Sequence, residues 1–138
     1  MANKPPVLAS FFMPMRPPTA TAQEKGVNTT GDKPHFYDKP RTGDAKAKLE
    51  AHLAPYAPKA PYEGPIRLIA KWCYPVAGKH HDGEYKTTRP DTDNAQKLLK
   101  DAMTRLGYWK DDAQVASEVA EKFWADKPGI YIRIESLP

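Results

Sequence analysis

The chain of 138 residues contains one cysteine, Cys73, and no apolar run that approaches the length of a membrane span. A single cysteine excludes an internal disulfide and a cysteine-based zinc cluster. The N-terminal residues lack a basic region followed by an apolar block and a cleavage site, so we expect a cytoplasmic protein. The glycines are scattered along the chain, which argues against a glycine-rich nucleotide-binding loop.

Basic side chains slightly outnumber acidic ones, with 21 Lys and Arg against 17 Asp and Glu and a formal net charge of +4. This excess is compatible with nucleic-acid binding without establishing it, because many soluble proteins carry a similar charge. The length corresponds to one domain with a modest core. Composition therefore keeps nucleic acid among the candidate partners, and the type of reaction has to be inferred from the sequence motifs.

The first half of the chain holds most of the fifteen prolines, which favours short extended segments and loops. Residues 7–13 form an apolar run that predicts a strand, and residues 66–74 alternate in the manner of a second strand with one mostly apolar face. Residues 42–53 predict a short helix that ends before Pro55. Residues 19–40 contain few apolar side chains, and we expect a loop that is mobile until a partner binds it.

The clearest helix of the sequence follows a polar, glycine-containing loop. One continuous apolar stripe recurs there at helical spacing, formed by Ala95, Leu98, Leu99, Ala102, Met103 and Leu106. Asp93 can cap the start, with Gln96 in the capping-box position, and Gly107 can end the helix. Two alternating segments follow, at 115–124 and 130–134, and the turn between them predicts a β-hairpin.

Two aspartates, Asp91 and Asp93, precede the apolar stripe of this helix. On an extended segment, side chains two residues apart leave the same face. Two such carboxylates repel each other by roughly 4 kcal/mol at about 4 Å and an effective dielectric near 20, and a divalent cation between them relieves that repulsion. The ordinary alternative is that Asp93 caps the helix and Asp91 is a solvated loop residue. Spacing alone leaves both interpretations open.

Lys97 lies one helical turn beyond Asp93, and a second acidic pair, Asp111 and Asp112, follows the helix. Lys97 is either an exposed lysine paired with Asp93 or a cation beside a metal site, where it could meet a phosphate oxygen. Aspartates in a turn are common in themselves. We expect the strand after this turn to bring the pair back to the N-terminal region of the helix, where it would add a third carboxylate.

The spacing of the candidate ligands excludes two other kinds of metal site, a calcium loop and a zinc site. A calcium loop starting at Asp91 would need glycine at its sixth place and glutamate at its twelfth, where this chain has Gln96 and Ala102. His80 and His81 do not combine with the cysteine at any zinc-ligand spacing. Magnesium, which is bound by a few carboxylates together with water and substrate phosphate, fits the acidic pattern better.

One long run of residues resembles a known family, the RusA-type Holliday junction resolvases. These are crossover-junction endodeoxyribonucleases that are often carried by phage and prophage. The resemblance covers about residues 86–134 and rests on three pieces, Arg89-x-Asp91-x-Asp93-Asn94-x-x-Lys97, Asp101-Ala102, and Gly107-x-Trp109-x-Asp111-Asp112-Ala113-Gln114-Val115. Their fixed spacings and unusual combination of residue types make the signal specific.

The resemblance implies an α/β fold, as one small domain spanning residues 1–138, with a mixed β-sheet, two main helices and a homodimeric assembly. It implies acidic clusters that use Mg2+, with Mn2+ as a substitute, to nick two opposed strands of a four-way DNA junction in recombination and repair. Asp91, Asp93 and Asp112 match the essential acids of the family, which hold the metal, and Lys97 matches its important lysine. The supporting motif positions are Asn94, Asp101 and Asp111.

Basic side chains around this motif are candidates for contacts with DNA phosphates, and ordinary solvated surface is the alternative for each of them. The candidates are Lys79, Lys86, Arg89, Lys100 and Arg105. Two other functions share the scaffold. One is a non-catalytic protein that binds branched DNA, and the other is a nuclease that acts on flaps and replication forks.

Overall fold

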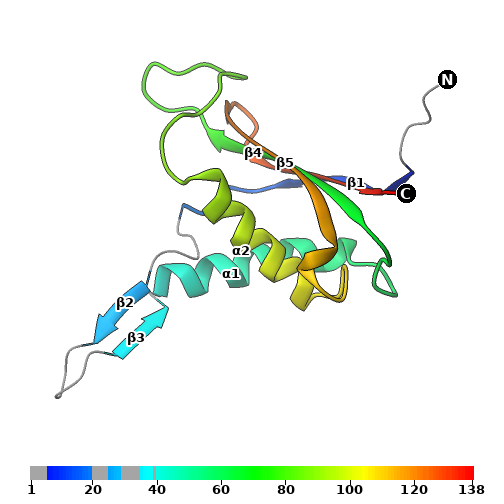
Figure 1. The fold of residues 1–138 in the computed structure, drawn as a ribbon. Coiled ribbons are helices and arrows are strands. Elements are labelled where there is room, and N and C mark those ends of the chain that lie inside the picture. The colour runs from blue at the N-terminus through cyan, green and yellow to red at the C-terminus, as the bar shows by residue number, and fades with distance from the viewer. Residues whose placement is uncertain (1–5, 20–24, 29–34, 39) are drawn as a thin grey trace.

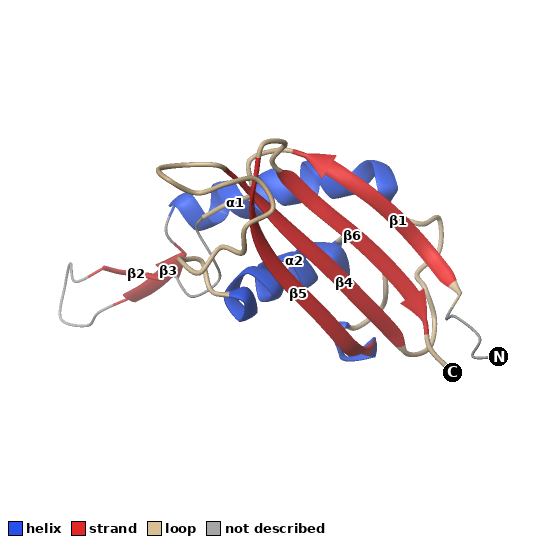
Figure 2. Cartoon of the chain, turned by 90° about the horizontal axis from the view of Figure 1, so that it is seen from above, coloured by secondary structure: helices blue, strands red, loops and turns tan. Residues whose placement is uncertain are grey.

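The computed structural model of the chain has a four-stranded sheet with two helices packed against one of its faces (Figure 1). It describes residues 6–19, 25–28, 35–38 and 40–138. The strands are β1 (Val7–Pro14), β4 (Ile66–Pro75), β5 (Val115–Ala125) and β6 (Gly129–Ser136). Their order is β1-β6-β4-β5, in which β4 pairs parallel with β5 and antiparallel with β6 (Figure 2). The predicted mixed α/β sheet is therefore confirmed.

The two helices of the sheet-covering layer are α1 (Pro40–Leu53) and α2 (Thr92–Arg105). Short 3-10 turns follow at η1 (Ala54–Tyr56) and, before β5, at η2 (Asp112–Gln114). Both predicted helices are confirmed, with starts two or three residues earlier than the periodicity indicated. No helix in the described part of the chain is long and apolar enough to cross a membrane.

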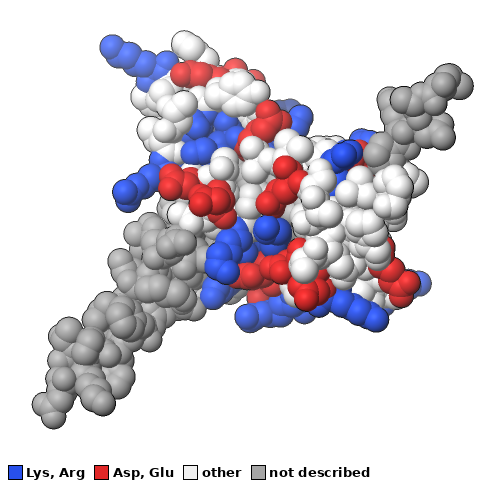
Figure 3. Space-filling view, viewed as in Figure 1, with Lys and Arg blue, Asp and Glu red and all other residues white. Residues whose placement is uncertain are grey.

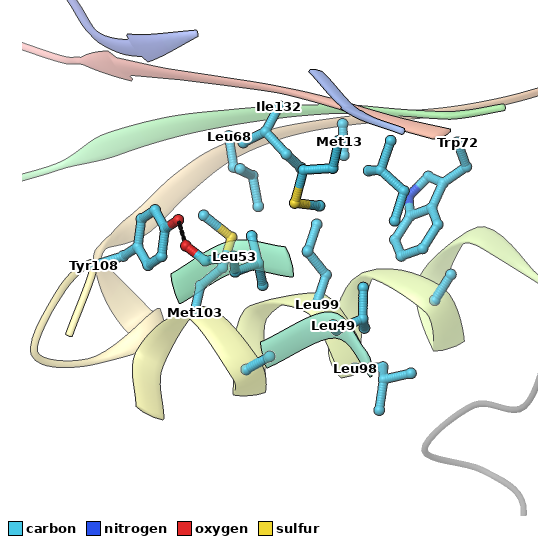
Figure 4. Close-up of a cluster of buried hydrophobic side chains, with 14 of the residues drawn as sticks. Met13, Leu49, Leu53, Leu68, Trp72, Leu98, Leu99, Met103, Tyr108 and Ile132 are labelled. Carbon is cyan, nitrogen blue, oxygen red and sulfur yellow. Dashed lines mark hydrogen bonds between the residues drawn. The ribbon is translucent and has the colours of Figure 1, made fainter. Parts of the chain in front are cut away.

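The core lies between the helices and the inner face of the sheet (Figure 4). Alternation along β4 buries every second side chain, and the apolar stripe of α2 packs beneath them. Fully buried members include Leu49, Leu53, Leu68, Trp72, Leu98, Leu99, Met103, Tyr108 and Ile132. The Tyr108 hydroxyl also donates a hydrogen bond to the carbonyl of Leu53 over 2.6 Å, which ties the corner after α2 to the end of α1.

The predicted hairpin between the last two strands is wrong, because β5 and β6 do not pair with each other. Strand β4 lies between them, and the turn at 126–128 crosses its end. Strands two places apart in a sheet are separated by about 10 Å, which this short turn can span. The burial pattern explains the order, since β4 and β6 bury most of their apolar side chains whereas β5 is largely half-exposed and takes the edge.

The region predicted as a loop at 19–40 contains two short strands, β2 (Lys25–Asn28) and β3 (His35–Asp38), which pair antiparallel. This ribbon projects away from the sheet and helices (Figure 1). Residues 20–24, 29–34 and 39 lie outside the described residues. The prediction missed these strands because four residues are too few to display a clear alternation.

A chain of polar contacts fixes the rotation of α2 on the sheet. The indole Nε1 of Trp72 donates to Oε1 of buried Gln96 over 2.6 Å, and Nε2 of Gln96 donates to Oε2 of Glu118 over 2.8 Å. The other carboxylate oxygen of Glu118 accepts from Lys100 over 3.2 Å. Since Gln96 joins β4 and β5 to one face of α2, the opposite face is held towards solvent.

We predict that Leu99→Ala lowers the free energy of unfolding by about 2–5 kcal/mol, because it removes a fully buried side chain from the contact between α2 and the sheet. Urea unfolding followed by circular dichroism would measure the loss. Val119→Ala is the matched control, since Val119 is 38% exposed and its truncation should cost less than about 1 kcal/mol. Equal losses for the two variants would contradict this description of the core.

Candidate active site

The first acidic pair lies at the N-terminal end of α2. Asp91 is the N-cap residue in an extended conformation, and its backbone carbonyl accepts from the amide of Ala95 over 3.0 Å. Asp93 lies inside the first turn, where its Oδ1 accepts from the backbone amide of Asn94 over 3.0 Å. The N-cap position is therefore held by Asp91 and not by Asp93 as predicted, and the Asp91 side chain makes no capping hydrogen bond. Both side chains are exposed at the helix end whose partial positive charge stabilises carboxylates.

The second acidic pair begins the short turn η2. Oδ1 of Asp111 accepts from the amide of Ala113 over 2.8 Å, so this carboxylate caps the turn. Asp112 is exposed and takes no part in the cap. The two neighbouring acids are thus divided between a structural role for Asp111 and a carboxylate that Asp112 presents to solvent.

Gln114 belongs to the motif that resembles the family, but no role was predicted for it from the sequence. Its Oε1 accepts from the amides of Lys110 and Asp111 over 3.0 and 3.3 Å, and its Nε2 donates to the carbonyls of Tyr62 and Gly64 over 3.0 and 3.1 Å. The side chain therefore holds the acidic turn against the segment before β4. The signal was present in the sequence, because Asp111 and Gln114 have the spacing of a capping box.

A pocket of about 500 Å³ lies at the C-terminal end of α2 and includes Asp112. Its lining combines residues of α1, α2 and the acidic turn, namely Lys46, Glu50, Asp101, Ala102, Thr104, Arg105, Lys110, Asp111 and Asp112. Acidic and basic side chains are intermixed over the helix layer (Figure 3). The pocket therefore places carboxylates beside basic side chains that could contact a phosphate.

The three acids of the motif do not meet within one chain. Asp91 and Asp93 lie at one end of α2 and Asp112 lies beyond its other end, and a helix of 14 residues is about 21 Å long. Among the described residues, no group of three or more His, Cys, Asp or Glu side chains could hold a metal ion. The expected return of the acidic turn is wrong, because β5 begins beside the start of β4 and only its far end reaches the first acidic pair.

The donor chemistry of the acids nevertheless suits Mg2+, which prefers carboxylate oxygens. One chain offers the carboxylates of Asp91 and Asp93 at one end of α2, whereas Asp112 lies at the other end beside Glu50, Asp101 and Asp111. Among the described residues no three acidic side chains lie close enough together to hold a metal ion, so a three-carboxylate magnesium site does not fit a single chain.

The lysine of the motif points along the exposed face of α2. Lys97 Nζ lies 3.9 Å from Oδ2 of Asp101, so its partner within the chain is Asp101 and not Asp93. Of the predicted phosphate contacts, Arg105 is exposed with its Nε 3.4 Å from Oε1 of Glu50, whereas Lys100 is held by the carboxylate of the Gln96 network. The loop residues Lys79 and Arg89 are exposed and therefore accessible to DNA.

Lys86 is the one predicted phosphate contact that is buried. Its ammonium donates to the carbonyl of Arg89 over 2.8 Å and to the hydroxyl of Thr88. Burial, and then the nearby charge of Lys122, lower the pKa of Lys86. The structure therefore places Lys86 inside the loop before α2 rather than on a surface that faces DNA.

Comparison with known proteins agrees with the resemblance noted in the sequence. Residues 15–135 match the family described as Endodeoxyribonuclease RusA. The chain is 37% identical over 119 residues to a crossover junction endodeoxyribonuclease rusA of Lactococcus phage r1t, covering 85% of this chain and 89% of the relative. It is 27% identical over 131 residues to the uncharacterized protein YqaN of Bacillus subtilis (strain 168), covering 87% and 91% of the two chains. The chain therefore belongs to the RusA family of endodeoxyribonucleases.

Proposed function

We propose that this protein is a Mg2+-dependent endonuclease that resolves four-way DNA junctions by paired nicks during recombination and repair. The observation that carries the proposal is the family match across residues 15–135, a range that contains the whole acidic motif. The phage relative whose name specifies crossover junctions supports the substrate. A non-catalytic DNA-binding protein would have no need for three solvent-facing carboxylates near phosphate.

The separation of the acids supports a homodimer as the active form. A two-fold axis across the middle of α2 would place the N-terminal end of each helix beside the C-terminal end of its partner. Asp91 and Asp93 of one copy would then approach Asp112 of the other, and the same contact would occur a second time. Two equivalent sites about one helix length apart suit an enzyme that must cut two strands symmetrically.

Charge along the exposed ridge of α2 supports this antiparallel contact. Residues four apart form a ridge on a helix, and here that ridge reads Asp93, Lys97, Asp101, Arg105. Antiparallel pairing about the midpoint sets Asp93 against Arg105 and Lys97 against Asp101, with opposite charges in every pair. Exposed ion pairs contribute only about 0.2–1 kcal/mol each, so they select the register while the burial of surface stabilises the dimer.

Within such a site, the residues of the two chains have separate tasks. The carboxylates of Asp91, Asp93 and Asp112 would bind Mg2+, which supplies polarisation of the scissile phosphate and acidification of a bound water. Lys97 would offset negative charge on the phosphate, and the exposed Arg89 would hold the neighbouring backbone.

We predict that Asp112→Asn reduces Mg2+-dependent nicking of a labelled four-way junction more than about 100-fold. Removing a metal ligand should lower activity by more than the roughly 10- to 100-fold that is usual when a residue orienting a ligand is removed. The variant should still shift the junction in a gel, because its phosphate contacts are intact. Glu63→Gln is the control, as Glu63 is an exposed acid outside the motif. Undiminished nicking by Asp112→Asn would contradict the proposal, and flap and fork substrates in the same assay would reveal a broader nuclease.

We predict that Asp101→Lys raises the dissociation constant of the dimer about tenfold, because the change sets two like charges against each other twice per dimer. Sedimentation velocity would measure the dissociation constant without reference to cutting. The double variant Lys97→Asp/Asp101→Lys exchanges the two charges and should restore the dimer. If both variants dimerise like the unmodified protein, the pairing of α2 ridges is refuted.

A further inference from the structure

The segment that leads into the first acidic pair is held by two lysine side chains. Nζ of Lys122 donates to the carbonyls of Thr88 and Pro90, each over 2.7 Å. Nζ of Lys86 donates to the carbonyl between them, that of Arg89, over 2.8 Å. Three consecutive carbonyls immediately before Asp91 are therefore each bound by an ammonium group.

Both lysines are anchored to the sheet. Lys122 belongs to β5, and its carbonyl accepts from the backbone amide of Lys86 over 2.9 Å, so the loop continues the edge of the sheet. The ammonium of Lys86 lies 4.5 Å from the ring centre of Trp124 and 5.2 Å from that of Tyr74. These rings surround the buried cation from the sheet side, and cation–π attraction adds to the hydrogen bonds.

This arrangement exceeds what an ordinary loop requires. Carbonyls in an exposed turn can be satisfied by water, whereas hydrogen bonds from charged donors are roughly twice as strong and fix the backbone in one conformation. The amino group of lysine has three donors and can bridge carbonyls that no single backbone amide could reach. The rigid part of the loop is also the part that sets where Asp91 leaves the chain.

We propose that Lys86 and Lys122 are positioning residues for the acidic pair of this enzyme. By fixing residues 88–90 to β5, they present the carboxylates of Asp91 and Asp93 together at the start of α2 and contact neither DNA nor metal themselves. The inference rests on the proposed metal-dependent function for its consequence, and on the hydrogen bonds of Lys86 and Lys122 for its geometry.

The test uses Lys122→Met in the full chain, which keeps the apolar stem and removes the donor. Hydrogen exchange should rise at least about tenfold for the amides of Lys86 and Ala95, which are hydrogen-bonded on either side of the held segment, and remain unchanged in β4. Mn2+ affinity, measured by calorimetry, should fall about 10- to 100-fold, as is usual when a partner that orients a metal ligand is lost. Lys122→Arg retains donors and should recover most of the affinity.

Lys71→Met is the matched control, because Lys71 also extends from the sheet but is exposed and lies over the ring of Tyr131. It should change neither measurement. Unchanged exchange at Lys86 and Ala95 in Lys122→Met would show that Lys122 does not hold the segment, and raised exchange with undiminished Mn2+ affinity would show that its contacts are purely structural. The exchange measurement needs neither metal nor DNA. If the unmodified protein bound no Mn2+, the proposed function would be refuted, but the exchange data would still test whether Lys122 holds residues 88–90.

Discussion

The packing of α2 against β4 determines where every acid of the motif can be. The apolar stripe of the helix is buried beneath the sheet, and the contact from Trp72 to Gln96 prevents the helix from rotating. Because the helix is rigid and about 21 Å long, Asp91 and Asp112 are held apart by a fixed distance. In the proposed antiparallel dimer, this separation would set the spacing between the two sites.

Electrostatics gives a reason for keeping the acids divided. Three carboxylates gathered in one chain would repel one another whenever the metal was absent, whereas the separated groups are each solvated or supported locally. Asp91 and Asp93 lie at the positive end of a helix, and the carboxylate of Asp111 caps the turn η2. In the proposed dimer, complete assembly of the acidic cluster would coincide with dimer formation and metal binding, which would restrict cutting to the assembled dimer.

The sequence predicted the local elements well because their signals are local. The stripe from Ala95 to Leu106 and the alternation along β4 identified α2 and the central strand within a few residues, and the resemblance of the run around the acids identified the family. Strand order was not predictable in the same way, since the insertion of β4 between β5 and β6 depends on competition among strands for burial. The role of Lys122 was likewise hidden, because its partners are backbone carbonyls more than thirty residues away.

The most direct test of a site shared between two copies is subunit mixing. Asp93→Asn and Asp112→Asn chains should each fail to nick a four-way junction when alone. When the two are co-expressed, a mixed dimer would combine the intact Asp91 and Asp93 of one chain with the intact Asp112 of the other, and one strand of the junction should be nicked. If mixed dimers form, as mass spectrometry would verify, and still do not cut, then the acids do not act across the interface and the account is wrong.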